Sequence, residues 1–516
     1  MNKEKVTINR LERSSINMFS NATGYIVPML INFITMPLLL RELGEAAFGL
    51  QSLVAVIIGY LTFMDIGFDL PITKLLAEDH SRKDIKGENH LLSTTLQLYV
   101  GVGLISIIVI TLMANWLVKS IFKVPDDLTG QAVTVFRLAG IGFLGSMVMS
   151  WGRAVAMGLH RFDLSSSVSV ILSTAGTLIG LGGVYAGYGV VGYVSIRVIF
   201  TLLAGPIYFG LTRYLLPNFS FLPGIDRATI RRVRSYVGYG ALNRFTGSLA
   251  GRLDQTLLGI WVGVAAAGIY SVPFLLVNSL SYMLAAMLVF IFPMASELQS
   301  LGEMDRLRDI FIRSSRFIAA LAGLIFIPLI VLGDLFLTLW TPTISAKAAG
   351  VLRLLALAGY IGTLTATLPN NVMVGLGKMR QFTVYATIRA VVLAVFCLIF
   401  IRPLGIEGAG WALLLTCSVD VIYLVIVLRF HLQLGVMQLF RQAYLKPVLL
   451  GIVFFGLSFL TRPLAVTWLG LGSAGVILAI VYLSAGFATG IFGETEKRAV
   501  TGLWEKAARQ VSKNIG

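Results

Sequence analysis

Long apolar runs separated by short polar segments recur along the whole chain. A mostly apolar window of about 18 residues or more is long enough to cross a bilayer as a helix. The approximate bounds of these spans are 16–40, 48–77, 91–118, 133–157, 166–186, 190–213, 236–261, 266–295, 311–338, 349–374, 382–401, 408–429, 447–462 and 467–491. The pattern predicts an all-α integral membrane protein with about fourteen transmembrane helices.

Basic residues divide unevenly between the two sides that these spans define. The side that holds both termini carries most of the 41 lysines and arginines. The opposite side carries only Arg41, Lys119, Lys123, Lys347, Arg402 and Arg462. Because basic residues in short loops mark the cytoplasmic side, both termini are predicted to be cytoplasmic. The net charge of +16 is therefore assigned to a membrane surface and not to nucleic acid.

Sequence similarities between the two halves recur at a nearly constant spacing of 216 to 222 residues. The matching stretches are LLRELGEAAFGL (39–50) with LLGIWVGVAAAGIY (257–270), GLHR (158–161) with GLGK (375–378), GVVGY (189–193) with GIEGA (405–409), and Pro71 with Pro293. Repeats separated by six helices have the same orientation in the membrane. We therefore expect two parallel six-helix lobes around a central cavity.

These boundaries predict six parts of the chain. They are a cytoplasmic segment (1–15), an N-lobe (16–214), a basic cytoplasmic linker (215–235), a C-lobe (236–431), two additional helices (447–491) and a basic tail (492–516). Apolar residues of the tail fall at helical spacing among lysines and arginines. This pattern suits a helix lying on an anionic leaflet, and it suits a solvated helix equally well.

Arginines inside predicted spans are the first candidate site residues, because an intramembrane charge usually faces the protein interior or a cavity. Arg244 and Arg252 lie a little over two turns apart on one predicted helix. Two stacked guanidinium groups suit a phosphate or pyrophosphate. Alternatively they pair with Asp420 or other acids and join helices. Arg353 and Arg389 are further cavity-lining candidates, and each could instead form a structural ion pair or reach an interface.

Four acids in the spans are candidates for gating or ion coupling: Asp65, Asp69, Asp254 and Asp420. Asp65 and Asp69 lie four residues apart, on one helix face. Asp69 is expected near the cytoplasmic surface, where it can also be an ordinary hydrated acid. Our hypothesis is a gate in which Asp65 pairs with Arg244 until an anionic substrate displaces it. A helix-joining contact within one lobe is the alternative.

Motifs for catalysis and cofactor binding are weak or absent. GYGVVG (187–192) matches a dinucleotide fingerprint, but it follows no strand and has no acid about 20 residues later. Cys397 and Cys417 lie in apolar runs, and the four histidines lack metal-ligand spacing. No loop is long enough for an extracytoplasmic catalytic domain. We expect no cofactor, no metal and no enzymatic activity.

Four stretches together resemble a known family. PLLLRELGEAAFGL (37–50), MDIGFDLPITKLLAE (64–78), DQTLLGIWVGVAAAGIYS (254–271) and GIEGAGWA (405–412) are similar to polysaccharide flippases of the O-antigen (Wzx) type. That family belongs to the multidrug/oligosaccharidyl-lipid/polysaccharide (MOP) exporter superfamily. The resemblance runs through both lobes, from about residue 15 to residue 430, and is weakest in the last two helices.

The resemblance implies a bacterial inner-membrane transporter. Such a protein flips an undecaprenyl-pyrophosphate-linked oligosaccharide to the periplasmic leaflet by alternating access, for surface polysaccharide synthesis. It also implies a cationic cavity, and a polysaccharide polymerase and a chain-length regulator as partners. The driving force would be an ion gradient, with H⁺ or Na⁺ as the coupling ion, the membrane potential, or removal of the product by later enzymes. A lipid II flippase and a cation-coupled multidrug exporter of the same superfamily remain alternatives. A membrane glycosyltransferase is disfavoured by the short loops.

Overall fold

The computed structural model describes residues 2–61, 69–234, 247 and 251–491. All regular structure within these ranges is helical. Ten helical segments there are long and apolar enough to cross a membrane. The chain is therefore an all-helical, multi-pass membrane protein, as the apolar pattern predicts.

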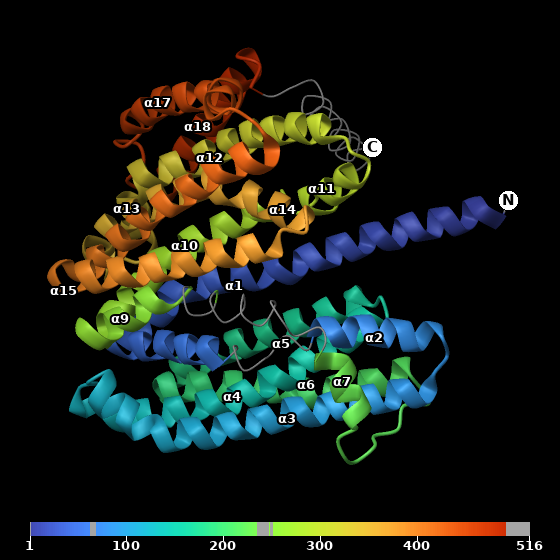
Figure 1. Cartoon of the computed structure of the whole chain (residues 1–516). Helices are drawn as coiled ribbons and strands as arrows, with labels where there is room; N and C mark the ends of the chain where they lie inside the picture. The colour runs from blue at the N-terminus through green and yellow to red at the C-terminus, as the bar shows by residue number, and fades with distance from the viewer. Residues whose placement is uncertain (1, 62–68, 235–246, 248–250, 492–516) are drawn as a thin grey trace, which may run out of the picture. The chain divides into compact units, whose positions relative to one another are not determined.

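One compact unit contains residues 1–272 together with residues 397–409. Its helices are α1 (Asn2–Leu61), α2 (Asp69–Ser81), α3 (Ile85–Trp116), η2 (Leu117–Ile121), α4 (Asp126–Gly158), α5 (Phe162–Gly183), η3 (Val184–Tyr188), α6 (Gly189–Leu215), α7 (Arg227–Arg234) and α9 (Leu253–Trp261). Helix α4 packs against α3 and α6, and Figure 1 shows these three helices side by side. Helix α5 packs against α1 and α6.

The other compact unit contains residues 273–396 and 410–516. Its helices are most of α10 (Val264–Ala286), α11 (Ile291–Ser300), α12 (Met304–Trp340), α13 (Ser345–Gly362), η4 (Thr363–Thr367), α14 (Leu368–Gly375), most of α15 (Met379–Ile426), η5 (Val427–Leu432), α16 (Val436–Leu439), η6 (Phe440–Tyr444), α17 (Leu445–Leu460) and α18 (Trp468–Ala488). Helix α12 packs against α13, α17 and α18. The predicted six-part division of the chain stays a prediction, because units defined by packing do not test repeat boundaries.

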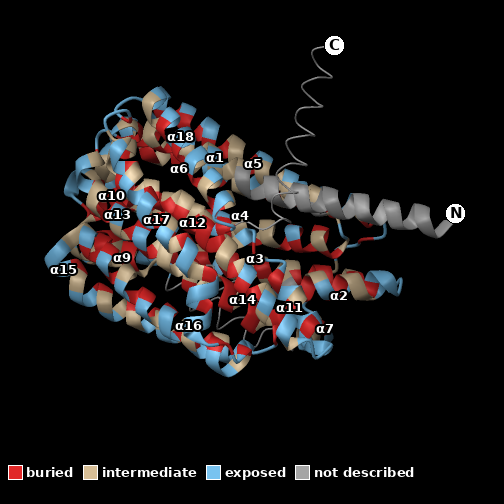
Figure 2. Cartoon of the chain, turned by 90° about the horizontal axis from the view of Figure 1, so that it is seen from above, coloured by how far each residue is buried: buried red, intermediate tan, exposed pale blue. Residues whose placement is uncertain are grey.

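Burial follows the helix faces. Figure 2 shows buried and exposed positions alternating around individual helices. Large side chains such as Trp151 and Tyr482 are fully buried, whereas Leu112 and Leu469 are largely exposed. Apolar residues on the outside of long helices are expected where lipid is the solvent.

Three of the ten membrane-length segments each extend over all or part of two predicted spans. A glycine with positive φ divides each of them: Gly44 (φ 75°), Gly189 (φ 59°) and Gly405 (φ 58°). Residues with a side chain rarely adopt this region, so glycine permits the break between two helices. The predicted span 236–261 is described only in part. The number of fourteen helices and the sides of the termini therefore stay predictions.

One predicted span is two helices. The span at 266–295 breaks after α10, and α11 begins at Ile291 after a turn at residues 287–290. Pro293 is the third residue of α11. Proline is tolerated in the first turn of a helix, where its missing N–H would have no helical partner. Pro293 therefore lies in the first turn of the helix that follows this break.

Candidate functional site

Two of the predicted site residues, Asp65 and Arg244, lie outside the described residues. The gate between them therefore stays a hypothesis. Asp69 is the first residue of α2 and is half-buried.

Arg252 and Asp254 lie at the start of α9, and their surroundings differ. Arg252 directly precedes α9 and is half-buried. Its side chain lies against Gly59 of α1, where any added Cβ would collide with the guanidinium group. Gly59 therefore leaves the space that Arg252 fills.

Asp254 is buried, with only 2% of its surface exposed. The hydroxyl of Tyr270 donates a hydrogen bond to one carboxylate oxygen of Asp254, and the backbone N–H of Gln255 donates to the other at 2.7 Å. Both oxygens therefore have protein donors, as a buried carboxylate requires. Two residues further along α9, the hydroxyls of Thr256 and Tyr60 lie 2.6 Å apart and join α9 to α1.

Asp420 and Arg389 form an ion pair inside α15, with 2.9 Å between Arg389 Nε and Asp420 Oδ1. The hydroxyl of Tyr385 donates to the same oxygen at 2.7 Å. Asp420 is fully buried, whereas 29% of the Arg389 side chain is exposed. The second oxygen, Asp420 Oδ2, is buried without a hydrogen-bond partner in the described part of the chain.

Arg353 belongs to a second ionic cluster. Asp334 of α12 accepts hydrogen bonds from Arg353 at 3.0 Å and from Arg462 at 2.7 Å, both to Oδ2. One carboxylate thus faces two guanidinium groups, and the cluster carries a net positive charge. Because 48% of the Arg353 side chain is exposed, this arginine keeps donors that can reach a further anion. Arg353 and Arg389 each form an ion pair, which was one of the alternatives considered for them from the sequence. Their role in binding a substrate stays a prediction.

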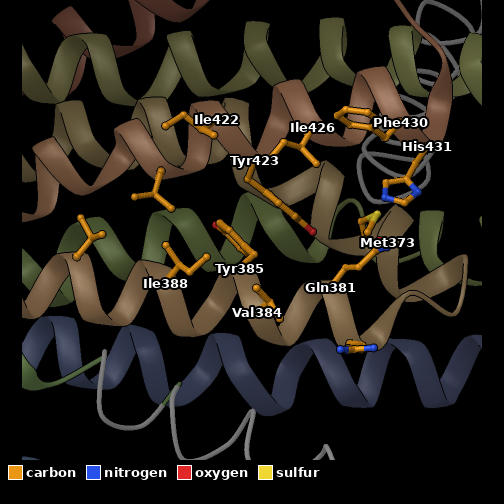
Figure 3. A pocket seen from close by; sticks show the side chains of 13 residues that line it. Met373, Gln381, Val384, Tyr385, Ile388, Ile422, Tyr423, Ile426, Phe430 and His431 are labelled. Atoms are coloured by element: carbon orange, nitrogen blue, oxygen red, sulfur yellow. The ribbon is translucent and has the colours of Figure 1, made fainter.

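The two halves of α15 enclose a groove of about 870 Å³ (Figure 3). Its lining residues are Met373, Arg380, Gln381, Val384, Tyr385, Ile388, Val392, Val419, Ile422, Tyr423, Ile426, Phe430 and His431. The rings of Tyr385 and Tyr423 stack within it, with 3.7 Å between their centroids and 10° between their planes. The sequence analysis missed this groove. The tyrosines at matching places in two neighbouring spans were the available signal.

The sequence analysis also missed a polar ladder on α3. Asn89, Ser93 and Gln97 lie one turn apart and bind the backbone of residues 218–224 in the linker. Gln97 Nε2 donates to the carbonyl of Leu222 at 2.9 Å, and its Oε1 accepts from the N–H of Gly224 at 3.0 Å. Polar residues repeating every four positions at the start of a span were the visible signal.

The linker continues into α7. Two acidic residues, Asp79 and Asp226, fix the position of this helix through hydrogen bonds. Arg232 forms a bidentate ion pair with Asp79 of α2, at 2.7 and 3.1 Å. The Asp79 carboxylate raises the pKa of Arg232 through these hydrogen bonds. Asp226, before α7, accepts from the hydroxyl and the backbone N–H of Thr229, both at 2.7 Å, and these bonds lower the pKa of Asp226.

No group of three or more histidine, cysteine or acidic side chains that could hold a metal ion occurs among the described residues. The two cysteines are free and buried.

Comparison with known proteins identifies the family. Residues 15–299, more than half of the chain, match the family described as "Polysaccharide biosynthesis protein". The chain is 25% identical over 356 residues to AglR, a candidate flippase of Haloferax volcanii, and the match covers 68% of each chain. It is 21% identical over 376 residues to a candidate O-antigen transporter of Shigella flexneri, covering 70% of this chain and 85% of that protein.

Solved transporters share the fold. The lipid II flippase MurJ in an inward closed conformation matches with a TM-score of 0.72 and 10% identity, over 92% of this chain and 100% of MurJ. An inward-facing multidrug resistance MATE family transporter of the MOP superfamily matches with a TM-score of 0.66 and 15% identity, over 82% of this chain and 97% of that one. The chain therefore belongs to the polysaccharide biosynthesis protein family and shares the fold of these two transporters.

Proposed function

We propose that this protein flips an undecaprenyl-pyrophosphate-linked oligosaccharide from the cytoplasmic to the periplasmic leaflet of a bacterial inner membrane. The observation that carries the proposal is the family match over residues 15–299. Alternating access between two lobes is the proposed mechanism, and the helical transporter fold supports it. The product would enter surface polysaccharide synthesis, with a polysaccharide polymerase and a chain-length regulator as the proposed partners.

The arginines are the proposed contacts of the pyrophosphate. Arg252 is half-buried beside a glycine, in a span where a charge is costly unless it has a role. A guanidinium group offers parallel donors that match two phosphate oxygens. Arg244, on the same predicted helix, would extend this cationic path. Arg353 would bind the anion through the exposed part of its side chain, and Arg389 would do so only by exchanging its partner Asp420.

Asp420 is the proposed coupling carboxylate. A buried carboxylate oxygen without a donor is costly, and a bound proton or monovalent cation removes that cost. Oδ2 of Asp420 is such an oxygen within the described residues. H⁺ or Na⁺ is therefore the proposed coupling ion. Asp254 is less suited, because protein donors already occupy both of its oxygens. Asp65 and Asp69 keep the proposed gating role.

The lipid II flippase is the second candidate, because MurJ shares this fold over nearly the whole chain. Its substrate is also an anionic lipid, so the arginines do not separate the two functions. A multidrug exporter of the same superfamily is the third candidate, because a MATE transporter shares the fold. Cationic drugs would not be attracted by a path lined with arginine.

Substrate competition tests the proposal. Purified protein in liposomes would be assayed for leaflet exchange of a fluorescent undecaprenyl-pyrophosphate oligosaccharide, with unlabelled lipid II or a cationic dye as competitor. We expect unlabelled carrier-linked oligosaccharide to inhibit the exchange at least tenfold better than either competitor. Equal or better inhibition by lipid II would replace the proposed function with the second candidate.

A further inference from the structure

The groove between the two halves of α15 is polar at one end and apolar along the rest of its length, as a lipid molecule is. Figure 3 shows His431 and Gln381 near one end and Ile388 and Ile422 toward the other. Arg380 lies in the first turn of α15, next to Gln381. The remaining lining is aliphatic, aromatic or methionine. An apolar channel with one polar end suits an acyl chain that carries a charged headgroup.

The groove opens on the outer surface of its helices. Val384, Ile388 and Ile422 line it and are 52%, 50% and 59% exposed. Large apolar side chains exposed midway along membrane helices contact lipid tails. A chain from the surrounding bilayer can therefore enter sideways.

Contacts among side chains behind the groove fix the position of its wall. Tyr385 stacks on Tyr423 and donates to the fully buried Asp420, which is also paired with Arg389. The tyrosine rings thus have fixed positions, and the two halves of α15 are joined by groups that a bound chain would not need to displace. A preformed apolar site loses little conformational entropy on binding.

The polar end is cationic. Lys378, Arg380 and Arg429 are all exposed, and His431 lines the groove beside them. Arg380 has neither an ion pair nor a hydrogen bond within the described residues. Basic pockets between transmembrane helices on the cytoplasmic side bind anionic lipid headgroups. The predicted topology places this end of α15 on that side.

We propose that this groove binds an anionic phospholipid, with one acyl chain between the two halves of α15 and the phosphate at Arg380 and Lys378. A bulk phospholipid fits better than the lipid-linked oligosaccharide, because the polar lining among the described residues consists only of Arg380, Gln381, His431 and two tyrosine hydroxyls. The hydroxyl of Tyr385 is bonded to Asp420, and that of Tyr423 is buried without a partner in the described part of the chain. That set has too few free polar groups to recognise a sugar chain. Arg252 is not among the residues that line the groove.

Native mass spectrometry of the full-length protein tests the proposal. Protein in detergent would be titrated with phosphatidylglycerol and with phosphatidylcholine of the same chain length. We expect phosphatidylglycerol to bind at least tenfold more tightly, and Arg380→Gln with Lys378→Gln to remove the preference. The matched control is Arg306→Gln, an exposed arginine of α12 that should leave the preference unchanged.

Filling the groove provides an independent variant. Val384→Trp should reduce binding of both lipids at least fivefold, whereas Val391→Trp, exposed on the same helix but outside the lining, should not. Equal affinity for both lipids in the wild type, or equal losses in variant and control, would overturn the proposal. Displacement of phosphatidylglycerol by an equimolar amount of undecaprenyl phosphate would also overturn it, in favour of the carrier lipid. Neither result depends on transport activity.

Discussion

Gly49 and Gly268 occupy corresponding positions in the internal repeat and lie directly against each other. A Cβ added at Gly268 would meet the Cα of Gly49 at 2.7 Å. Three residues further along each segment, Ser52 and Ser271 face each other with 3.0 Å between their hydroxyl oxygens. Two equivalent segments therefore cross at equivalent residues, which is the geometry of a local two-fold axis.

Substitution at this crossing should be costly. Gly268→Ala is expected to destabilise the protein by about 1–3 kcal/mol, because backbone atoms of Gly49 cannot move aside as a side-chain tip can. The measurement is the unfolding midpoint in detergent. Gly472→Ala is the matched control, since Gly472 lies in α18 with nothing near its added Cβ and alanine is the better helix former. Equal shifts in the two variants would contradict the close contact.

The buried ion pair of α15 gives a second prediction. Asp420→Asn should destabilise the protein by about 3–5 kcal/mol, because Arg389 would keep its charge in a largely buried position without its partner. The double variant Asp420→Asn with Arg389→Gln should recover part of this loss. Thermal unfolding of the single and double variants measures the coupling. Strictly additive effects would show that the pair does not act as a unit.

The hydrogen bonds of the polar ladder on α3 predict that Gln97 fixes the position of the linker. A fluorophore attached through Ala228→Cys would report the motion of α7, because the native cysteines are buried. Gln97→Ala should lower its anisotropy, since three hydrogen bonds to the linker are lost. Gln299→Ala, an exposed glutamine of α11, is the control. Unchanged anisotropy in Gln97→Ala would contradict the role of the ladder.

Acid should release the same linker. Hydrogen bonds from Thr229 hold the pKa of Asp226 below the ordinary value of an aspartate, so the ionised form is favoured in the folded state. The stabilisation from Asp226 is therefore present at neutral pH and is lost as pH falls through the lowered folded pKa. The anisotropy at Ala228→Cys should therefore fall as the pH drops below about 4, the ordinary pKa of an aspartate.

Asp226→Asn supplies the control for that pH step. An amide does not titrate, so the variant should show lower anisotropy at pH 7 and no step on acidification. Circular dichroism over the same range would separate linker release from global unfolding. A step of equal size in wild type and Asp226→Asn would assign the titration to another group.

The apolar pattern predicted an all-helical membrane protein, because the length of an apolar run is a local property of the sequence. Gly189 and Gly405, matched in the repeat, both have positive φ, and so do His160 and Gly377. The ionic partners were not predictable in the same way. Arg462 lies 128 residues from Asp334, and only packing of α12 against the loop after α17 brings them together.

The groove could not be predicted from hydrophobic periodicity, because it depends on a contact between two separate spans. Tyr385 and Tyr423 belong to separate spans, and their stacking depends on how the two halves of α15 fold back at Gly405. The polar ladder on α3 was easier to predict from the sequence, because Asn89, Ser93 and Gln97 share one helix face. A polar stripe at the start of an apolar span can therefore be interpreted as a docking face for a nearby loop.

Leaflet exchange tests the central claim most directly. Purified protein would be reconstituted in liposomes with a fluorescent undecaprenyl-pyrophosphate oligosaccharide, beside Arg252→Ala and the surface control Arg306→Ala. The proposed function predicts exchange at least tenfold faster than in protein-free liposomes, a loss of tenfold or more in Arg252→Ala, and no loss in Arg306→Ala. Absence of exchange in liposomes that still export a cationic dye would contradict the flippase function.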